Sequence, residues 1–201
     1  MEGGAQTWLG TDWKLDPNAS WRDARLRQED THPVVCVSWK DANAYAEWLS
    51  DQSTKNYRLL TEAECEYVTR AGCIAPFWWG ASISPVQANY DARFPYAFGG
   101  SKGKRRKATV PVNCYEANPW GLFNVHGNVW QWCEDVWHEN YYGAPVDGSP
   151  WLNGGDSSLR VVRGGSWGNS PRRLRSASRG GFIASARYNA IGFRLARTLS
   201  H

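Results

Sequence analysis

The stretch from Arg160 to Arg197 constrains the fold more than any other part of the chain. It alternates apparent anchor segments with short runs rich in Gly, Ser, Ala and Asn. The anchors are Val161–Trp167, Leu174–Ala177, Arg179, Arg187 and Ile191–Arg194. This layout is typical of a surface whose backbone is fixed by buried anchors while the intervening side chains stay exchangeable. It favours a binding role before a catalytic one.

The length and composition indicate one domain. A chain of 201 residues is long enough for one well-buried core and short for two. Thirteen Trp and 20 Gly together suggest a loop-rich protein held together by large aromatic side chains. We therefore expect residues 1–201 to form a single α+β domain with two short helices packed on small sheets and much irregular loop. Its variable, ligand-binding region would span about residues 160–197.

The charge is modest overall but unevenly placed. The net charge is +4, yet the 160–197 stretch holds nine Arg and no Asp or Glu. Because these arginines are scattered, we expect them to bond loop carbonyls and acids elsewhere in the chain. The basic run Ser101–Lys107 is interpreted as a solvated loop tip. A nucleic-acid partner is not expected.

The cysteines and the termini bear on the compartment. The five Cys are odd in number and contain no CxxC pair, so we expect free thiols that pack as small apolar groups. No run resembles a signal peptide or is long enough to span a bilayer. The location is therefore left open between the cytoplasm and export by a non-standard route.

The sequence predicts two helices from the residues that would cap their N-termini. Ser38 followed by Asp41 predicts a helix over residues 39–50, and Thr61 followed by Glu64 predicts a second one that ends near Gly72. Strands are expected at 33–37, within 121–132, at 161–164 and at 193–197. Residues 1–31 give no clear signal.

Six segments together resemble the formylglycine-generating-enzyme (sulfatase-modifying factor) family, a variant of the C-type-lectin fold. They occur in the family's order and are His32–Trp39, Arg58–Glu64, Asn118–Asn124, Gly127–Trp132, Arg163–Trp167 and Gly192–Arg194. The resemblance covers most of the chain and implies that fold. The N-terminal part is shorter than usual, so the family's opening hairpin is expected to be missing or altered.

The resemblance also implies what catalysis would need. The family's copper-dependent oxidases carry two Cys shortly after the Gly-Gly-Ser-(Trp/Tyr) segment, where thiolates hold the metal. The corresponding run, Gly168–Leu174, contains no Cys. We therefore expect no copper and no catalytic residues, and a divergent oxidase is the alternative function. Related sulfoxide synthases use iron-binding His on an added helical domain, which nothing in this chain matches.

A structural calcium ion is the cofactor that the resemblance does suggest. In the family, the segment like residues 124–131 surrounds Ca²⁺ with side-chain and carbonyl oxygens. The matching ligands here would be the Asn124 side chain, the Gly127 and Val129 carbonyls, and Gln131. Gln131 stands where a Glu is often found, and the lost carboxylate should weaken binding. The alternative is that Asn124 and Gln131 only hydrogen-bond the loop.

The C-terminal layout also resembles that of the variable proteins of diversity-generating retroelements, many of which use this fold. Their randomised codons exclude Lys, Glu, Gln, Met and Trp, and none of these occurs at the positions between the anchors. The expected ligand-binding positions are Gly168, Asn169, Ser170, Arg172, Arg173, Ser178, Gly180, Gly181, Phe182, Ile183, Ala184, Ser185, Ala186, Tyr188, Asn189 and Ala190.

These observations lead to a functional hypothesis. We expect a non-catalytic protein that displays a diversified surface to a protein or other macromolecular ligand. Exposed Phe182, Ile183 and Tyr188 would anchor that ligand, as aromatic side chains do in antibody paratopes; the alternative is that they are ordinary core. The competing functions are a divergent oxidase of the formylglycine-generating type and a regulatory or scaffold domain.

Overall fold

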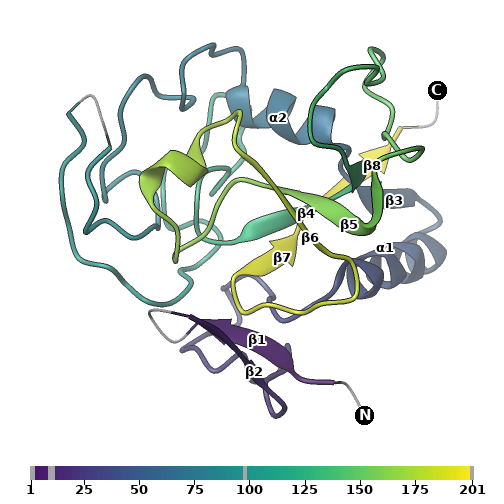
Figure 1. Ribbon diagram of the computed structural model, residues 1–201, viewed down its shortest axis with the longest axis horizontal. Helices are drawn as coiled ribbons and strands as arrows, with labels where there is room; N and C mark the ends of the chain where they lie inside the picture. The colour runs from purple at the N-terminus through teal and green to yellow at the C-terminus, as the bar shows by residue number, and fades with distance from the viewer. Residues whose placement is uncertain (1–2, 9–11, 97–98, 200–201) are drawn as a thin grey trace.

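The computed structural model describes residues 3–8, 12–96 and 99–199. Its helices are α1 (Trp39–Ser53), α2 (Glu62–Arg70) and the short 3-10 helix η1 (Pro171–Leu174). Its strands are β1 (Ala5–Trp8), β2 (Trp13–Asp16), β3 (Asn56–Leu59), β4 (Trp130–Trp137), β5 (Asp156–Arg163), β6 (Arg179–Ile183), β7 (Ile191–Phe193) and β8 (Leu195–Thr198). Long irregular segments join these elements, so the fold is the expected α+β arrangement of two helices, small sheets and much loop (Figure 1).

Within the described ranges, the strands form three small sheets. The central sheet has the order β6-β5-β4-β7, in which β4 and β7 are parallel and the other pairs antiparallel. Two antiparallel ribbons, β1-β2 and β3-β8, lie outside it. The predicted closing strands near 161–164 and 193–197 are confirmed as parts of β5, β7 and β8.

Both helices begin where their caps predict. The Ser38 hydroxyl accepts from the Asp41 backbone N–H at 3.1 Å, and the Asp41 carboxylate accepts from the Ser38 N–H at 2.8 Å. Thr61 and Glu64 form the same reciprocal pair at the start of α2. Each box satisfies N–H groups that a helix N-terminus otherwise leaves open. These local signals explain why the two helices are correctly predicted from sequence.

Three predictions of local structure are wrong. Residues 33–37 form no strand, because Cys36 adopts a left-handed φ of 58° that interrupts an extended run. Within 121–132 only the residues from Trp130 onward join a strand. The N-terminal part, expected to lack clear structure, contains the short hairpin β1-β2.

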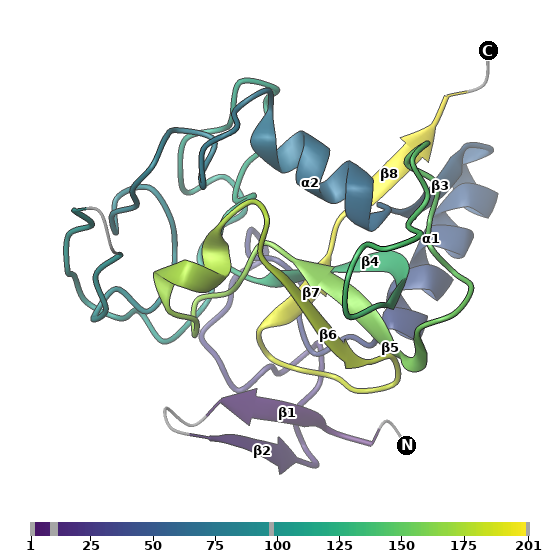
Figure 2. The ribbon, with the colours of Figure 1, turned by 45° about the horizontal axis from the view of Figure 1, so that its top comes forward.

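The hairpin is held by the C-terminal region. The Gln6 N–H donates to the Arg187 carbonyl at 2.7 Å, and the Asn189 N–H donates to the Gln6 carbonyl at 3.0 Å. Both views show the hairpin beside the connection that follows β6 (Figures 1 and 2). A segment near one end of the chain therefore covers part of the proposed variable region.

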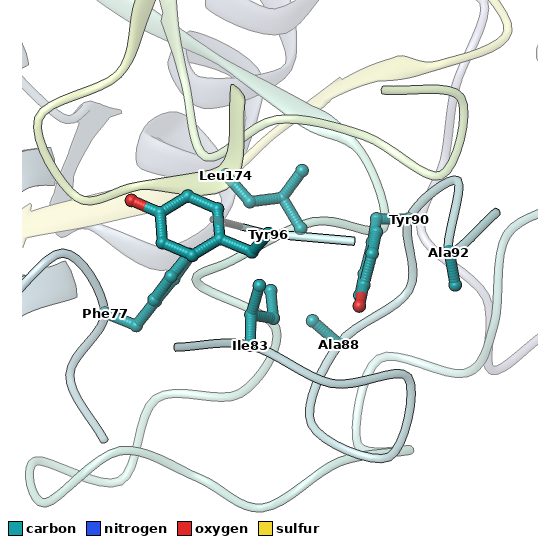
Figure 3. Close-up of a cluster of buried hydrophobic side chains, with 7 residues drawn as sticks. All are labelled: Phe77, Ile83, Ala88, Tyr90, Ala92, Tyr96 and Leu174. Atoms are coloured by element: carbon teal, nitrogen blue, oxygen red, sulfur yellow. The ribbon is translucent and has the colours of Figure 1, made fainter. Parts of the chain in front are cut away.

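Several clusters make up the core. One of them fills the loop-rich half of the molecule and contains Phe77, Ile83, Ala88, Tyr90, Ala92, Tyr96 and Leu174. Figure 3 shows the Leu174 side chain directed at the aromatic rings of this cluster. Another cluster joins α1 to the central sheet through Ala42, Trp130, Trp132, Val162 and Ile191. Buried aromatic area rather than long helices holds the loops in place, as the composition indicates.

Several arginines of residues 160–197 act as expected. Arg187 binds Asp41 through two nitrogens at 2.8 and 2.9 Å, and Arg179 binds Glu62 at 2.6 and 2.7 Å. Others donate to carbonyls, as Arg160 does to Glu134 O at 3.0 Å. Guanidinium groups thus tie the C-terminal strands to acids and loops elsewhere in the chain. Among the described residues, none of the helices has the length and hydropathy needed to cross a membrane.

Candidate functional site

The turn from Gly164 to Trp167, directly after β5, defines the candidate site. Gly164 and Gly165 have φ values of 93° and 76°, which favour glycine. A Cβ on Gly165 would lie 2.8 Å from the Arg173 carbonyl, so no larger residue fits. The turn is fixed from outside by hydrogen bonds from Gly127 N to Gly164 O at 2.8 Å and from Trp167 N to Asn128 O at 2.9 Å.

Ser166 and Asn169 close the turn on itself. The Asn169 Oδ1 accepts from the Ser166 N–H at 3.0 Å and from the Ser166 hydroxyl at 2.9 Å. The Asn169 carbonyl in turn accepts from the Asp91 N–H at 2.9 Å. Asn169 therefore holds the backbone of the turn, and replacing it would disturb the fold. These contacts argue against free exchange of the side chain at this position.

Arg105 lies against this turn, although the basic run that contains it was expected to be solvated. Only 3% of its side chain is exposed, and its guanidinium carbon lies 5.7 Å from the ring centroids of both Trp8 and Trp167. Its Nε is 3.5 Å from the Asp91 Oδ2. Burial raises the pKa of Asp91, but hydrogen bonds from Arg93 and the charge of Arg105 outweigh it, so the pKa of Asp91 is lowered. The solvated interpretation is therefore wrong for Arg105.

The sixteen expected ligand-binding positions differ widely in exposure. Four of them are exposed: Arg172, Arg173, Ile183 and Ser185. Three are buried: Ser178, Asn189 and Ala190. The other nine are half-buried: Gly168, Asn169, Ser170, Gly180, Gly181, Phe182, Ala184, Ala186 and Tyr188. Among the anchors, Trp167, Leu174 and Ile191 are buried as expected, but Ala177 is exposed. These positions therefore do not form one continuous exposed face.

The aromatic anchors of the expected paratope pack onto the core instead. Phe182 and Tyr188 contact each other edge to face, with centroids 5.0 Å apart, and both pack on the α1–sheet cluster. Trp13 of the N-terminal hairpin covers Tyr188 at 5.3 Å. Only Ile183, at 51% exposure, faces solvent as predicted. The idea of an exposed aromatic triplet is wrong because a distant hairpin supplies the packing partner.

Asn189 is another structural residue. Its Oδ1 accepts from the Trp8 N–H at 3.3 Å, its Nδ2 donates to Ala24 O at 3.4 Å, and its carbonyl accepts from the Trp167 indole at 3.3 Å. The side chain is completely buried. It joins the N-terminal segment to the Gly164–Trp167 turn, so its exchange would separate two parts of the fold.

Residues 168–174, which follow this turn, contain no thiol. Leu174 fills the core, and residues 168–173 offer amide, hydroxyl and guanidinium groups. Cys36 is buried in a separate cluster with Ala5 and Val129, and burial raises the pKa of its thiol to about 12. The turn thus lacks the soft, ionised ligands that copper prefers.

The expected calcium ligands lie partly together. Asn124 Oδ1 is buried and accepts no hydrogen bond within the described residues. Asn124 lines a cavity of about 220 Å³ together with Val129 and Gln131. An open oxygen of this kind suits a hard cation. Gln131 Oε1, however, accepts from Arg194 Nε at 3.0 Å. Gly127 is not among the residues that line the cavity. The described residues include no group of three or more His, Cys, Asp or Glu placed to hold a metal.

Sequence reasoning did not find a second hollow surface beside α2. A cavity of about 340 Å³ is lined by Glu62, Glu66, Asp135 and Tyr141, and a shallower one of about 750 Å³ by His138 and its neighbours; Trp151 lines both. Burial raises the pKa of Asp135 and raises that of Tyr141 to about 12. The acidic capping segment at residues 61–64 is the available sequence signal, and a capping segment by itself predicts only a helix start.

Comparisons with known proteins identify relatives that match most of this chain. The formylglycine-generating enzyme of Streptomyces coelicolor is 34% identical over 96% of this chain and 61% of its own length. The structure of PvdO from Pseudomonas aeruginosa is 34% identical with a TM-score of 0.75, and the match covers 97% of this chain and 70% of that one. This chain thus spans about three fifths of the Streptomyces enzyme.

The expectation of a diversified binding protein is wrong in the light of these matches. A variable protein of Treponema denticola has a similar structure, with a TM-score of 0.66 over 96% of this chain and 77% of that one, but only 20% identity. Such a likeness shows the fold alone. Relatives named as formylglycine-generating enzymes instead match most of the chain at 34% identity. The model of the sulfatase-modifying factor enzyme 1-like domain matches residues 4–199, and the chain belongs to this family.

Proposed function

We propose that the chain is a divergent enzyme of the formylglycine-generating type that modifies a side chain of a peptide or protein. The observation that carries this proposal is the cavity of about 340 Å³ beside α2, which shares the lining residue Trp151 with a shallower cavity of about 750 Å³. Cavities of this size suit a substrate side chain together with a short part of its peptide. The family match makes a side-chain modification the reaction class to test first.

Arg163, the first residue of the family-like segment Arg163–Trp167, contacts the residues that line this surface. Its Nη1 lies 3.2 Å from Glu62 Oε1 and 3.5 Å from the Tyr141 hydroxyl, both on the wall of the smaller cavity. The Tyr141 hydroxyl donates to Glu62 Oε1 at 2.8 Å. These contacts give the cavity wall a fixed set of hydrogen-bonding groups. Such preorganised groups can orient a substrate without rearrangement.

The chemistry differs from that of the copper oxidases to which the chain is related. Because residues 168–174 hold no Cys, we infer that the reaction does not use copper held by two thiolates at this turn. Formylglycine carries an aldehyde, so product formation can be followed with an aldehyde-directed probe. The substrate residue that we would test first is cysteine, with serine as the second choice.

The experiment incubates the full chain in air with cysteine- and serine-containing peptides, with and without added copper. Products are trapped with a hydrazide probe and identified by mass spectrometry. Replacing Tyr141 with Phe removes the hydroxyl from the cavity wall but keeps the ring. The matched control is Tyr45→Phe on α1, which lines neither cavity. We expect a modified peptide, a reduced rate for Tyr141→Phe, and an unchanged rate for the control.

The following results would contradict the proposal. Peptides left chemically unchanged by a folded protein would remove the enzymatic interpretation. A product formed equally well by Tyr141→Phe and by Tyr45→Phe would separate the activity from the surface beside α2. Peptide binding without any change in mass would indicate a domain that recognises substrates without turning them over.

We also propose that the 124–131 loop binds Ca²⁺ weakly. The support is the buried, unbonded Asn124 Oδ1 at the 220 Å³ cavity, with Val129 and Gln131 nearby. Calcium prefers carboxylate oxygens, and Gln131 offers only a neutral amide oxygen that already accepts from Arg194. The ion's role would be to stabilise the loop, with no part in the reaction.

A further inference from the structure

Two cysteines meet between helix α2 and strand β4. Cys65 lies in the second turn of α2 and Cys133 in the middle of β4. Both belong to one buried cluster with Leu60 and Val161, and their exposures are 5% and 0%. The two thiols are close enough that each shifts the pKa of the other.

The backbone fixes this pair on both sides. The Glu134 N–H donates to the Leu60 carbonyl at 2.9 Å, which joins the strand to the residues just before α2. The Glu62 N–H donates to the Asp135 carboxylate at 2.7 Å, which joins the first turn of the helix to the same strand. The contact between the thiols therefore follows from how α2 is anchored and does not depend on mobile loops.

We propose that Cys65 and Cys133 are a buried dithiol that a small oxidant such as hydrogen peroxide converts into a disulfide joining α2 to β4. Nothing in the proposed enzymatic function requires this bond, so the two proposals stand or fall separately. The bond would connect segments 68 positions apart in the chain. A link across a loop of this length restricts the unfolded chain strongly and should stabilise the fold.

The reaction balances with peroxide alone. The Cys65 thiolate attacks one peroxide oxygen and forms a sulfenic acid, and the leaving hydroxide takes up the proton that the thiol lost. Cys133 then attacks the Cys65 sulfur, the S–S bond forms, and the sulfenic oxygen leaves as water with the Cys133 proton. In total, two thiols and one peroxide give one disulfide and two waters.

The surroundings favour Cys65 as the first sulfur to react. The interaction with Cys133 lowers the pKa of Cys65, and the nearby Arg163 and Arg194 charges act in the same direction, while burial opposes them. Burial raises the pKa of Cys133. Because the thiolate is the reactive form, Cys65 is the attacking residue and Cys133 the resolving one. Access requires a small oxidant or a brief local opening of α2.

The remaining cysteines serve as internal controls. Cys36 is buried in a different cluster, and burial raises its pKa to about 12. Cys73 and Cys114 lie on loops, where Cys114 is exposed and Cys73 half-buried. A nonspecific oxidation would begin at the more accessible loop thiols. A selective bond between the two buried ones would therefore reflect their placement.

The test uses the folded full chain. Accessible thiols are first alkylated under native conditions, peroxide is added, and the protein is then unfolded, blocked with a second alkylating reagent and digested. We expect one cross-linked peptide pair that joins Cys65 to Cys133, with Cys36 still reduced. We also expect a higher melting temperature after oxidation that returns to its original value with a reductant.

Variants separate the specific bond from general oxidation. Cys65→Ala and Cys133→Ala should each abolish the cross-link and the melting shift, whereas Cys36→Ala should leave both. If a variant fails to fold, the peptide map of the unmodified chain still decides the matter. The proposal is overturned if Cys65 and Cys133 both remain alkylatable after exposure to peroxide, or if they bond mainly to other cysteines.

Discussion

Arg163 and Glu62 form an ion pair in the interior, with Nη1 and Oε1 3.2 Å apart and 2% and 7% of their side chains exposed. The same guanidinium binds Glu66 and donates to the Ser176 carbonyl at 2.8 Å. A single arginine of the Arg163–Trp167 frame thus joins α2, β5 and the segment after η1. Buried charges of this kind persist only when each has its partners.

Removal of this guanidinium should destabilise the protein strongly. Arg163→Met keeps much of the apolar stem but leaves Glu62 with fewer partners in the interior. We expect the free energy of unfolding to fall by about 3–5 kcal/mol, the range for breaking a buried pair from one side. Urea unfolding followed by tryptophan fluorescence measures it. Arg172→Met, at an exposed position, is the matched control and should change stability by less than about 0.5 kcal/mol.

The aromatic residues after β6 should behave as core. Tyr188→Ala removes a ring that packs on Phe182 and Trp13, so we expect a loss of about 2 kcal/mol in unfolding free energy. Ile183→Ser, at a position that faces solvent, should be close to neutral. Thermal unfolding of both variants compares them directly. A Tyr188→Ala protein as stable as the unmodified chain would restore the expectation of an exposed ring.

The elements that could be predicted from sequence are those that depend on near neighbours. Ser38 with Asp41 and Thr61 with Glu64 form contacts within one helical turn, so the sequence alone indicates where both helices begin. The resemblance of ordered motifs placed the fold correctly for a similar reason. The residue type within such a motif is fixed by buried geometry. At Gly165, for example, a Cβ would collide with the Arg173 carbonyl, so the turn requires glycine.

Exposure at the candidate site could not be predicted because it depends on distant segments. Arg105 lies inside since Trp8, Trp167 and Asp91 surround it, and none of them is close to it in sequence. Tyr188 is covered by Trp13, far away in the chain. The small residues of positions 168–190, and the absence of Lys, Glu, Gln, Met and Trp among them, are compatible with surface loops. Small residues also suit tightly packed turns, so this composition does not predict exposure.

A carboxylate at position 131 should strengthen calcium binding. Gln131→Glu adds a negative oxygen beside Asn124 at the 220 Å³ cavity. We expect Ca²⁺ to raise the melting temperature of this variant more than that of the unmodified protein, with Mg²⁺ giving a smaller effect. Gln52→Glu on α1 makes the same chemical change at an exposed position and should not respond. Equal responses of both variants would contradict a calcium site in the 124–131 loop.

His126 should make the protein less stable in mild acid. Burial lowers its pKa from 6.5 to about 4. The neutral ring is held between the Leu174 carbonyl at 2.7 Å on Nδ1 and the Trp78 N–H at 3.2 Å on Nε2. Between these two pKa values the unfolded chain binds a proton that the folded protein refuses, so stability falls as the pH falls from 6.5 toward 4. The full contribution is about 3 kcal/mol.

The measurement compares the unfolding free energy of the protein and of His126→Asn at several pH values between 7 and 4. The amide cannot titrate, so the variant should lose less stability over this interval even if it is less stable at pH 7. Carboxylates that titrate in the same range are common to both proteins and cancel in the difference. Parallel curves would show that His126 takes up its proton equally well in the folded and unfolded states, which its burial between Leu174 and Trp78 argues against.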